Sequence, residues 1–244
     1  MYFDKTHRRI MAEHIQSARV LSATQLTSQV RQLVVLPREQ PIGFKPGQWV
    51  SLKLPVGTRP PLNRAYSMAA PATATGELTL IFDRVTDGLG SGYLSQMKPG
   101  EELALSGPFG NFVLPPSIDR ELILVARYTG LVPIRCMLKE LYGQRYRDPV
   151  LLIAVAPAED ELLFHQELLS LAVTQPGFRY LPLVAADGEQ QAVDLTLPML
   201  RPILDRPAKV LPMLCGTKGF VRPLRSRFVE AGYDRKEVKT ETYD

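Results

Sequence analysis

The sequence predicts two folds in succession, an antiparallel β-barrel or sandwich followed by a doubly wound α/β domain. Three observations support this prediction. The length of 244 residues is typical of two domains. Residues from about 18 to 112 form short apolar stretches separated by turn residues, as in antiparallel sheets. After Pro115 and Pro116, continuous apolar stretches alternate with helical patterns, which indicates a parallel sheet covered on both faces.

The first half contains three clear strand patterns. Val50, Leu52 and Leu54 alternate with Trp49, Ser51 and Lys53, the period of two that is typical of a half-buried strand. Further strands are predicted over residues 78–85 and 102–105. The turns that separate them are Pro46-Gly47, Asp87-Gly88 and Pro99-Gly100. Short strands at this spacing predict a barrel or a sandwich.

The second half reads as alternating strands and helices. Strands are predicted over residues 121–126, 150–156, 180–184 and 209–215. Helices are predicted over residues 133–142 and 159–172, from about residue 197, and over residues 219–231. This alternation predicts a doubly wound sheet. We therefore expect an N-terminal arm over residues 1–16, a first domain over 17–115 and a second domain over 116–244.

The composition excludes several classes of protein. Hydrophobic residues make up 45% and charged residues 22%, which argues against a disordered chain. Two cysteines exclude a disulfide framework and an iron–sulfur cluster held by four thiolates of this chain. Three scattered histidines are too few for a convincing metal site, so we expect none. The sequence has no run of eighteen apolar residues and no secretory signal pattern, and we expect a cytoplasmic protein that does not span a membrane.

The net charge of +4 is concentrated at one end of the chain. Residues 201–244 contain ten Lys or Arg and six Asp or Glu, whereas the two signs balance over residues 1–200. An excess this small is a poor signal for nucleic acid, and we expect no nucleic-acid partner. A solvated basic helix explains it, and so does a site for an anionic ligand or an acidic partner.

The sharpest chemical pattern is Arg64-Ala65-Tyr66-Ser67. In an extended strand, Arg64 and Tyr66 point to one face and Ala65 and Ser67 to the other. An aromatic ring can stack on a planar cofactor, a guanidinium can pair with a phosphate, and a serine hydroxyl can reach a ring nitrogen. The tetrapeptide alone is a weak signal, because an exposed strand can have this sequence by chance.

Several glycine-rich segments follow it in order. Residues 88–94 form a turn in which Ser91 is expected to cap a helix, and the free N–H groups of such a helix end bind phosphate. Residues 107–112 close the first half. Thr129-Gly130 follows the first apolar strand of the second half, where a dinucleotide pyrophosphate binds in an open α/β sheet. Cys215-Gly216 ends a later strand.

This ordered set of motifs resembles the ferredoxin–NADP reductase family of FAD- and NAD(P)-binding oxidoreductases. The motifs are PGQ, RxYS, GxxS, GPxG, TGxxP, CG and a C-terminal Glu-x-aromatic, and the resemblance covers residues 17–244. Each motif is weak, but seven in order across two domains are specific. The resemblance implies a six-stranded antiparallel flavin-binding barrel followed by a nucleotide-binding domain. It also implies a flavin, and NADP or NAD as co-substrate with an atypical site; FMN remains an alternative, but the expected pyrophosphate cradle at Gly90 and Ser91 favours FAD.

The resemblance assigns roles to residues of the first domain. Arg64 is expected to hold the flavin pyrophosphate, with Ala65 in the same binding strand. Tyr66 is expected to stack on the isoalloxazine, and Ser67 to hydrogen-bond near N5, the atom that accepts hydride. The pyrophosphate is also expected to contact the helix start at Gly90 and Ser91.

The resemblance assigns further roles to residues of the second domain. Thr129 and Gly130 are expected to contact the pyridine-nucleotide pyrophosphate. Cys215, with Gly216, is expected beside the nicotinamide C4. The C-terminal Glu-x-aromatic is Glu241 and Tyr243, which lies near the flavin in relatives. Ser67, Cys215 and Glu241 are therefore the expected catalytic residues, and the expected electron partners are ferredoxin, flavodoxin or an oxygenase component.

The nucleotide half departs from the family pattern. Arg127 and Tyr128 stand where relatives usually have small residues, often Gly-Gly or Thr-Gly. Those glycines allow close approach of the pyrophosphate. The Tyr128 ring could fill this space or swing away to stack on a ring, and Arg127 could contact a phosphate.

Two further positions have lost their usual cations. Val155-Ala156-Pro157 replaces the usual Gly-x-Arg, and Ala185-Ala186 replaces the Ser-Arg that holds the 2′-phosphate of NADP. Lys218, Arg222 and Arg225 could substitute for them.

Three hypotheses follow. The first is an NAD(P)H-dependent flavin reductase with an altered nucleotide site and a weakened preference for NADP, which passes electrons to a separate carrier. The second is a flavoprotein that exchanges electrons with a protein partner and binds little NAD(P)H. The third is a non-enzymatic binding module on the same fold.

Overall fold

A computed structural model describes residues 14–57, 60–207 and 209–243. Most of the expected N-terminal arm, residues 1–13, lies outside this part of the chain, and the first strand begins at Ile15. The first half forms a six-stranded antiparallel sheet in the order β4-β3-β6-β1-β2-β5, as expected. Its strands are β1 (Ile15–Gln25), β2 (Val30–Pro37), β3 (Trp49–Leu54), β4 (Leu62–Ser67), β5 (Leu78–Asp83) and β6 (Glu102–Phe109).

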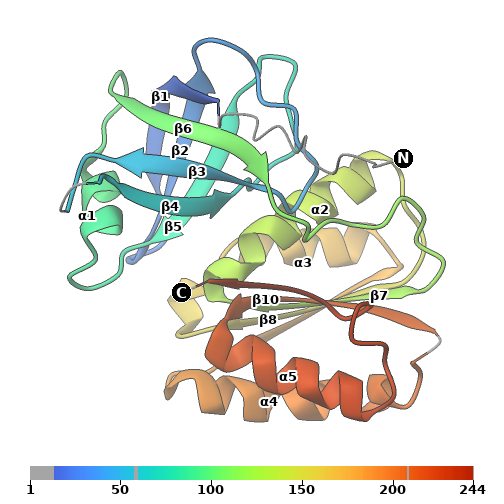
Figure 1. Cartoon of the computed structure of the whole chain (residues 1–244). Coiled ribbons are helices and arrows are strands. Elements are labelled where there is room, and N and C mark those ends of the chain that lie inside the picture. Colours follow the sequence, from blue (N-terminus) through green and yellow to red (C-terminus); the bar gives the residue numbers. More distant parts are fainter. Residues whose placement is uncertain (1–13, 58–59, 208, 244) are drawn as a thin grey trace, which may run out of the picture.

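The sheet curls into a barrel. An antiparallel bridge between Met68 and Leu80 joins the two ends of the strand order. Val50, Leu52 and Leu54 are buried inside it, which confirms the predicted alternation. Helix α1 (Leu89–Gln96) packs Leu94 into the same core. Helix α1 lies beside the start of β4, and the carboxyl end of β4 points away from α1 toward the second half of the chain (Figure 1).

The second half is a parallel five-stranded sheet in the order β11-β10-β7-β8-β9. The order reverses between β7 and β10, and ligands of open α/β sheets bind at the carboxyl ends of the strands beside such a reversal. The strands are β7 (Glu121–Arg127), β8 (Val150–Ala156), β9 (Phe178–Val184), β10 (Val210–Thr217) and β11 (Lys239–Tyr243). The helices are η1 (Tyr128–Gly130), α2 (Leu131–Gly143), η2 (Glu159–Glu161), α3 (His165–Thr174), α4 (Gly188–Leu204) and α5 (Lys218–Glu230).

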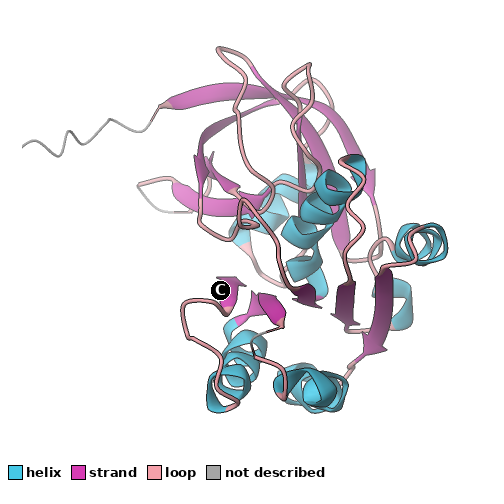
Figure 2. Cartoon of the chain, turned by 90° about the vertical axis from the view of Figure 1, so that its right-hand side faces the viewer, coloured by secondary structure: helices cyan, strands magenta, loops and turns pink. Residues whose placement is uncertain are grey.

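The helices cover both faces of this sheet. Helices α2 and α3 lie on the face toward the barrel, and α4 and α5 lie on the opposite face (Figures 1 and 2). Every residue of β8 is buried, and so are all but the first of β7, as expected for a strand covered on both faces.

Three elements of the second half differ from the sequence prediction. Helix α4 begins at Gly188 rather than near residue 197 and continues through Pro198, because a buried stripe from Ala192 to Ile203 holds it against the sheet. The helix predicted over residues 159–172 is interrupted at Phe164, whose φ is 56°. The edge strand β11 has a mostly polar sequence and was not predicted as a strand.

The two domains share one apolar cluster. Val30, Ala69, Ile81 and Phe112 of the barrel half pack with residues of α2 and of the central parallel strands. The shared core brings the end of β4 to the carboxyl edge of the parallel sheet, where the chain also ends (Figure 1). Within the described ranges, no helix has both the length and the apolar character needed to cross a membrane.

Candidate functional site

Arg64 and Gly90 form a cradle where β4 meets the first turn of α1. Arg64 is exposed on β4, and its Nη1 donates to the neighbouring Asn63 carbonyl oxygen at 2.9 Å. A Cβ atom placed on Gly90 would lie 3.5 Å from Cγ of Arg64, 3.1 Å from Leu54 and 3.2 Å from Leu62. The two motifs are therefore in contact, although twenty-six positions separate them in the chain. Their contact places a guanidinium beside a helix N-terminus.

The start of α1 presents backbone N–H groups. Its cap is Gly88, which offers no side-chain hydrogen bond, so the first-turn N–H groups have no partner within the helix. The expectation that Ser91 caps this helix is wrong, because the helix begins two residues before it. The Ser91 hydroxyl instead accepts from the Val85 N–H at 3.1 Å and contacts the Gly88 carbonyl at 3.3 Å. Ser91 thus shapes the turn, and the backbone supplies the groups suited to an anion.

Tyr66 lies on the same side of β4 as Arg64. Arg64 pairs with Leu52 and Tyr66 with Val50 on the adjacent strand, so the two side chains share a face, as the alternation predicts. The Tyr66 ring meets Phe82 edge-on, with centroids 6.0 Å apart. Burial raises the pKa of Tyr66 to about 12, so the phenol is neutral at physiological pH. Ala65 is exposed on the other face.

Ser67 connects the barrel to the carboxyl edge of the parallel sheet. Its Oγ donates to Oε1 of Glu241 at 3.1 Å and lies 3.3 Å from the hydroxyl of Tyr243. The Cys215 thiol contacts the same Tyr243 hydroxyl at 3.3 Å. Glu241 pairs with Cys215 across the register of β11 and β10. The three expected catalytic residues therefore lie in one hydrogen-bonded cluster with Tyr243.

This cluster has unusual proton affinities. Burial raises the pKa of Glu241 to about 7, and the hydrogen bond from Ser67 opposes this shift only in part. Burial likewise raises the pKa of the Cys215 thiol and of Tyr243 above their ordinary values. Near neutral pH, Glu241 is consequently the one group of the four that can both hold and release a proton.

The expected nucleotide loop packs tightly against the end of β10. A Cβ on Gly130 would lie 2.3 Å from the Cys215 carbonyl oxygen, and a Cβ on Gly216 would lie 2.6 Å from Cβ of Arg127. Gly216 also has a φ of 152°. The Thr129 hydroxyl faces the barrel, where it donates to Asp83 at 3.4 Å. Both glycines are thus required by the contact between the loop and the strand end, before any ligand is considered.

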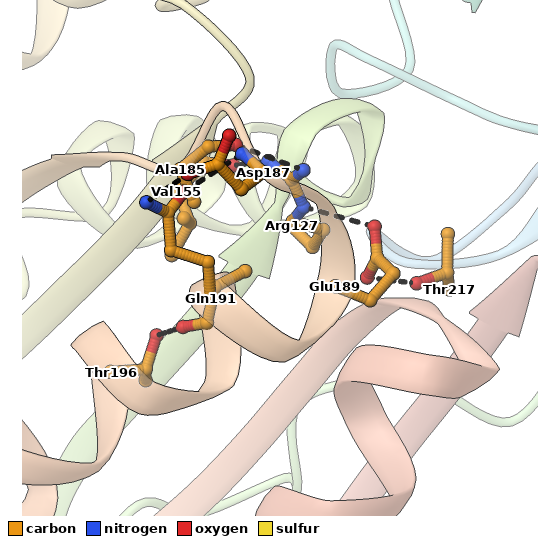
Figure 3. Close-up of polar contacts among 9 residues, drawn as sticks. Arg127, Val155, Ala185, Asp187, Glu189, Gln191, Thr196 and Thr217 are labelled. Atoms are coloured by element: carbon orange, nitrogen blue, oxygen red, sulfur yellow. Dashed lines mark hydrogen bonds and ion pairs between the residues drawn. The ribbon is translucent and has the colours of Figure 1, made fainter.

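Arg127 turns away from the loop and joins the ends of three strands (Figure 3). Its guanidinium donates to the carbonyl oxygens of Val155 at 3.2 Å and Ala185 at 3.5 Å. Its Nε donates to Oε1 of Glu189 at 3.2 Å, and the other oxygen of Glu189 accepts from Thr217 at 2.5 Å. Arg127 is only 7% exposed. A phosphate contact by Arg127 would therefore require this ion pair to open.

Tyr128 turns to the opposite side of the sheet. Its hydroxyl donates to Oε2 of Glu161 at 2.6 Å, and its ring lines a small cavity at the carboxyl end of β8 together with Ala156 and Tyr180. Its φ is 50°, a left-handed conformation that is uncommon for a residue other than glycine.

The remaining cations expected near the site follow β10. Lys218 and Arg222 are exposed in the first turns of α5, and Arg225 donates to the Arg235 carbonyl at 2.9 Å. A Cβ on Gly219, in the same first turn, would lie 3.4 Å from the side chain of Glu189. The start of α5 therefore borders the Arg127–Glu189 pair.

Sequence reasoning missed the acidic residues of the site. Glu161, Glu189 and Asp83 contact the nucleotide loop from three different elements. None belongs to a motif; Glu161 and Asp83 reach the loop through the packing of the two domains, and Glu189 through the packing of α4 on the parallel sheet. The replacement of small residues by Arg127 and Tyr128 was the only signal that compensating partners were needed.

Comparison with known proteins gives related sequences and structures. A family model described as the oxidoreductase FAD-binding domain matches residues 17–114. Ferredoxin–NADP reductase B of Sorangium cellulosum (strain So ce56) is 30% identical over 210 residues, which cover 82% of this chain and 86% of that protein. Methane monooxygenase component C of Methylosinus trichosporium is 33% identical over 199 residues, and this chain spans 57% of its length.

The fold also matches solved structures. The ferredoxin–NADP⁺ reductase of Plasmodium falciparum superposes with a TM-score of 0.82 at 17% identity, over 94% of this chain and 96% of that one. At this identity, the match supports the arrangement of the two domains alone.

Proposed function

The chain belongs to the ferredoxin reductase-like family of FAD-binding oxidoreductases, and on that premise we propose that it oxidises NAD(P)H and passes the electrons to a separate carrier. The names of its relatives point to ferredoxin and to oxygenase components as carriers, and flavodoxin is a third carrier class that we propose. When bound, FAD supplies the redox chemistry, since its N5 accepts a hydride from reduced nicotinamide and its ring releases electrons singly or in pairs.

The cradle of Arg64 and Gly90 is the observation that carries this proposal. A pyrophosphate requires hydrogen-bond donors. The cradle offers a guanidinium and the first-turn N–H groups of a helix that has no side-chain cap. The absence of a Cβ on Gly90 lets the first turn of α1 pack closely against β3 and β4, beside the stem of Arg64. The residues present therefore fit FAD, with Arg64 and α1 holding the pyrophosphate and Tyr66 available to the flavin ring.

The Ser67 cluster supplies a proton path beside the ring position. Ser67 Oγ lies between β4 and Glu241, and it is both a donor and an acceptor. A carboxyl with a pKa of about 7 can hold a proton at the working pH and deliver it through the serine hydroxyl. Tyr243 contacts the same serine hydroxyl and the Cys215 thiol, so it ties Ser67 to the end of β10. We propose this as the role of Ser67, Glu241 and Cys215.

An anaerobic titration tests the proposal. The purified, FAD-loaded protein is mixed with NADH or NADPH in the absence of oxygen, and the flavin absorbance near 450 nm is followed, on the order of seconds to minutes. We expect bleaching, and a weak preference for NADPH at most, because alanines at 185 and 186 offer no cation to a 2′-phosphate. Absence of bleaching by either nucleotide would contradict the proposal.

A second candidate function rests on the closed nucleotide loop. Arg127 and Tyr128 use their polar groups on Glu189 and Glu161, which favours a flavoprotein that exchanges electrons with proteins and binds little nucleotide. Reduction by a chemically reduced ferredoxin without any bleaching by NADH or NADPH would support this alternative. A protein that takes up no FAD would contradict both functions and leave a binding module.

A further inference from the structure

Glu161 is a buried carboxylate that joins the two domains. It is 5% exposed and accepts from four donors. The Ser28 hydroxyl lies 2.6 Å from Oε1 and the Gln29 N–H 3.2 Å from it, while Thr27 and Tyr128 donate to Oε2. Within the described part of the chain, no Lys, Arg or His forms an ion pair with it. A buried carboxylate is costly unless its oxygens are saturated, and here neutral donors saturate them.

The donors come from both sides of the domain boundary. Thr27, Ser28 and Gln29 form the turn between β1 and β2 of the barrel, and Tyr128 opens the loop between β7 and α2. Hydrogen bonds outweigh the opposing effect of burial and lower the pKa of Glu161, so it stays an anionic acceptor at physiological pH. One carboxylate thus fixes the loop and the barrel against each other.

Tyr128 needs this fixation because of its backbone. A left-handed φ of 50° costs a residue with a Cβ about 1 kcal/mol relative to glycine. The Tyr128 hydroxyl donates to Glu161, and this hydrogen bond holds the residue in that conformation. The conformation of Tyr128 in turn sets the direction of η1 and of the first N–H groups of α2, which face the carboxyl edge of the sheet.

We propose that Glu161 is a positioning residue for the pyridine nucleotide: through Tyr128 it holds the nucleotide loop in the left-handed turn, and through residues 27–29 it fixes that loop relative to the flavin barrel. In this arrangement a hydrogen bond substitutes for the conformational freedom of glycine. The inference rests on the proposed function, because it concerns the same nucleotide.

Three variants test the inference. Tyr128→Phe and Glu161→Gln weaken the hydrogen bond, and Tyr128→Gly removes the ring but adopts the left-handed turn without cost. The measurements are the binding of NAD⁺ and NADP⁺ by calorimetry, and the concentration dependence and limiting rate of anaerobic bleaching by NADH. We expect the first two variants to weaken nucleotide binding about tenfold, the loss typical of a charge-assisted hydrogen bond. Tyr128→Gly should bind nucleotide with an affinity within about threefold of that of the original chain, because glycine adopts the left-handed turn without the hydrogen bond.

Two matched controls separate positioning from general damage. Tyr142→Phe removes a buried phenol hydroxyl that has no partner in the described structure, and Glu159→Gln removes an exposed carboxyl of the same short helix. Both should bind nucleotide like the original chain. A second readout, hydrogen exchange, needs no nucleotide: residues 127–131 and 26–30 should exchange faster together in Tyr128→Phe and in Glu161→Gln, while the controls match the original chain.

Specific outcomes overturn the inference. Unchanged nucleotide binding and unchanged exchange in Tyr128→Phe would do so, even if Glu161→Gln fails to fold. Tighter binding in both Tyr128→Phe and Tyr128→Gly would show that the ring blocks the site instead of positioning the loop. If the original chain is bleached by NADH and the variants match it, the inference fails and the proposed function stands. If the original chain neither binds nor oxidises any nucleotide, the proposed function fails and the inference falls with it.

Discussion

Polar residues differ in their hydrogen bonding between the open side of the barrel and the carboxyl edge of the parallel sheet. On the barrel, Arg64 is exposed and bonds only to its neighbour's carbonyl among the described residues, and the start of α1 has no side-chain cap. At the sheet edge, Arg127 and Tyr128 donate to Glu189 and Glu161 within the protein. The donors on the barrel are therefore available to a ligand, whereas the donors at the sheet edge are already bonded within the protein.

This difference shows what a replaced motif residue does. When large polar residues occupy a binding loop, each of their polar groups needs a hydrogen-bond partner. Where water cannot reach such a group, another side chain of the protein supplies the partner. The partners here are acidic residues of two other elements, Glu161 and Glu189. The loop is therefore shaped by contacts within the protein. On the barrel, Arg64 has no such acidic partner among the described residues.

The largest expected effect is the loss of the barrel cation. Arg64→Ala removes a charge-assisted contact to the flavin pyrophosphate, which is worth roughly 1.5–3 kcal/mol, so FAD affinity should fall about 10- to 100-fold. The measurement is fluorescence titration of the FAD-free protein. Lys53→Ala is the control, because Lys53 pairs with Asn63 and lies on the other face of the sheet from Arg64. Equal FAD affinities for the two variants would mean that Arg64 does not hold the flavin.

The next effect concerns the arginine at the sheet edge. Arg127→Ala should lower the free energy of unfolding by about 2 kcal/mol, because it leaves two buried carbonyls and Glu189 without their donor. Urea denaturation measures this loss. Arg227→Ala removes an exposed pair with Glu230 and should cost less than about 0.5 kcal/mol. Unchanged stability of Arg127→Ala together with weaker nucleotide binding would mean that Arg127 serves the ligand after all.

A smaller effect separates two glycines of one helix. Gly90→Ala places a methyl group 3.1 Å from Leu54 and 3.2 Å from Leu62, and it crowds the stem of Arg64. We expect FAD affinity to fall about fivefold, roughly 1 kcal/mol, from this displacement. Gly92→Ala meets nothing within 4 Å and should bind FAD normally while stabilising the helix. If both variants bind FAD like the original chain, Gly90 is not part of the cradle.

The two regions also differ in how far the sequence predicts them. The period of two around Val50 and the apolar run of β8 predict both sheets, because burial dictates both patterns. The motifs predict which residues gather around Ser67. They do not predict Glu161 or Glu189, since such a carboxylate becomes part of a site only through tertiary packing: between the two domains for Glu161, and within the second domain for Glu189. The start of helix α4 is hard to predict for a related reason. Tertiary burial keeps Pro198 inside a helix that the sequence alone would begin later.

The last expected effect is a pH dependence at the junction of the two regions. Glu241 has a pKa of about 7 in the folded chain against an ordinary 4.5, because burial disfavours its charged form. Between these values the folded state holds a proton that the unfolded state has lost, so stability falls as pH rises through the window. One such proton contributes a slope of at most about 1.4 kcal/mol per pH unit. Glu241→Gln should reduce the loss of stability of the FAD-free protein between pH 5 and 7, measured by urea denaturation. Glu230→Gln removes an exposed carboxyl and should leave the slope unchanged, and the same slope in Glu241→Gln would mean that Glu241 holds no proton beside Ser67.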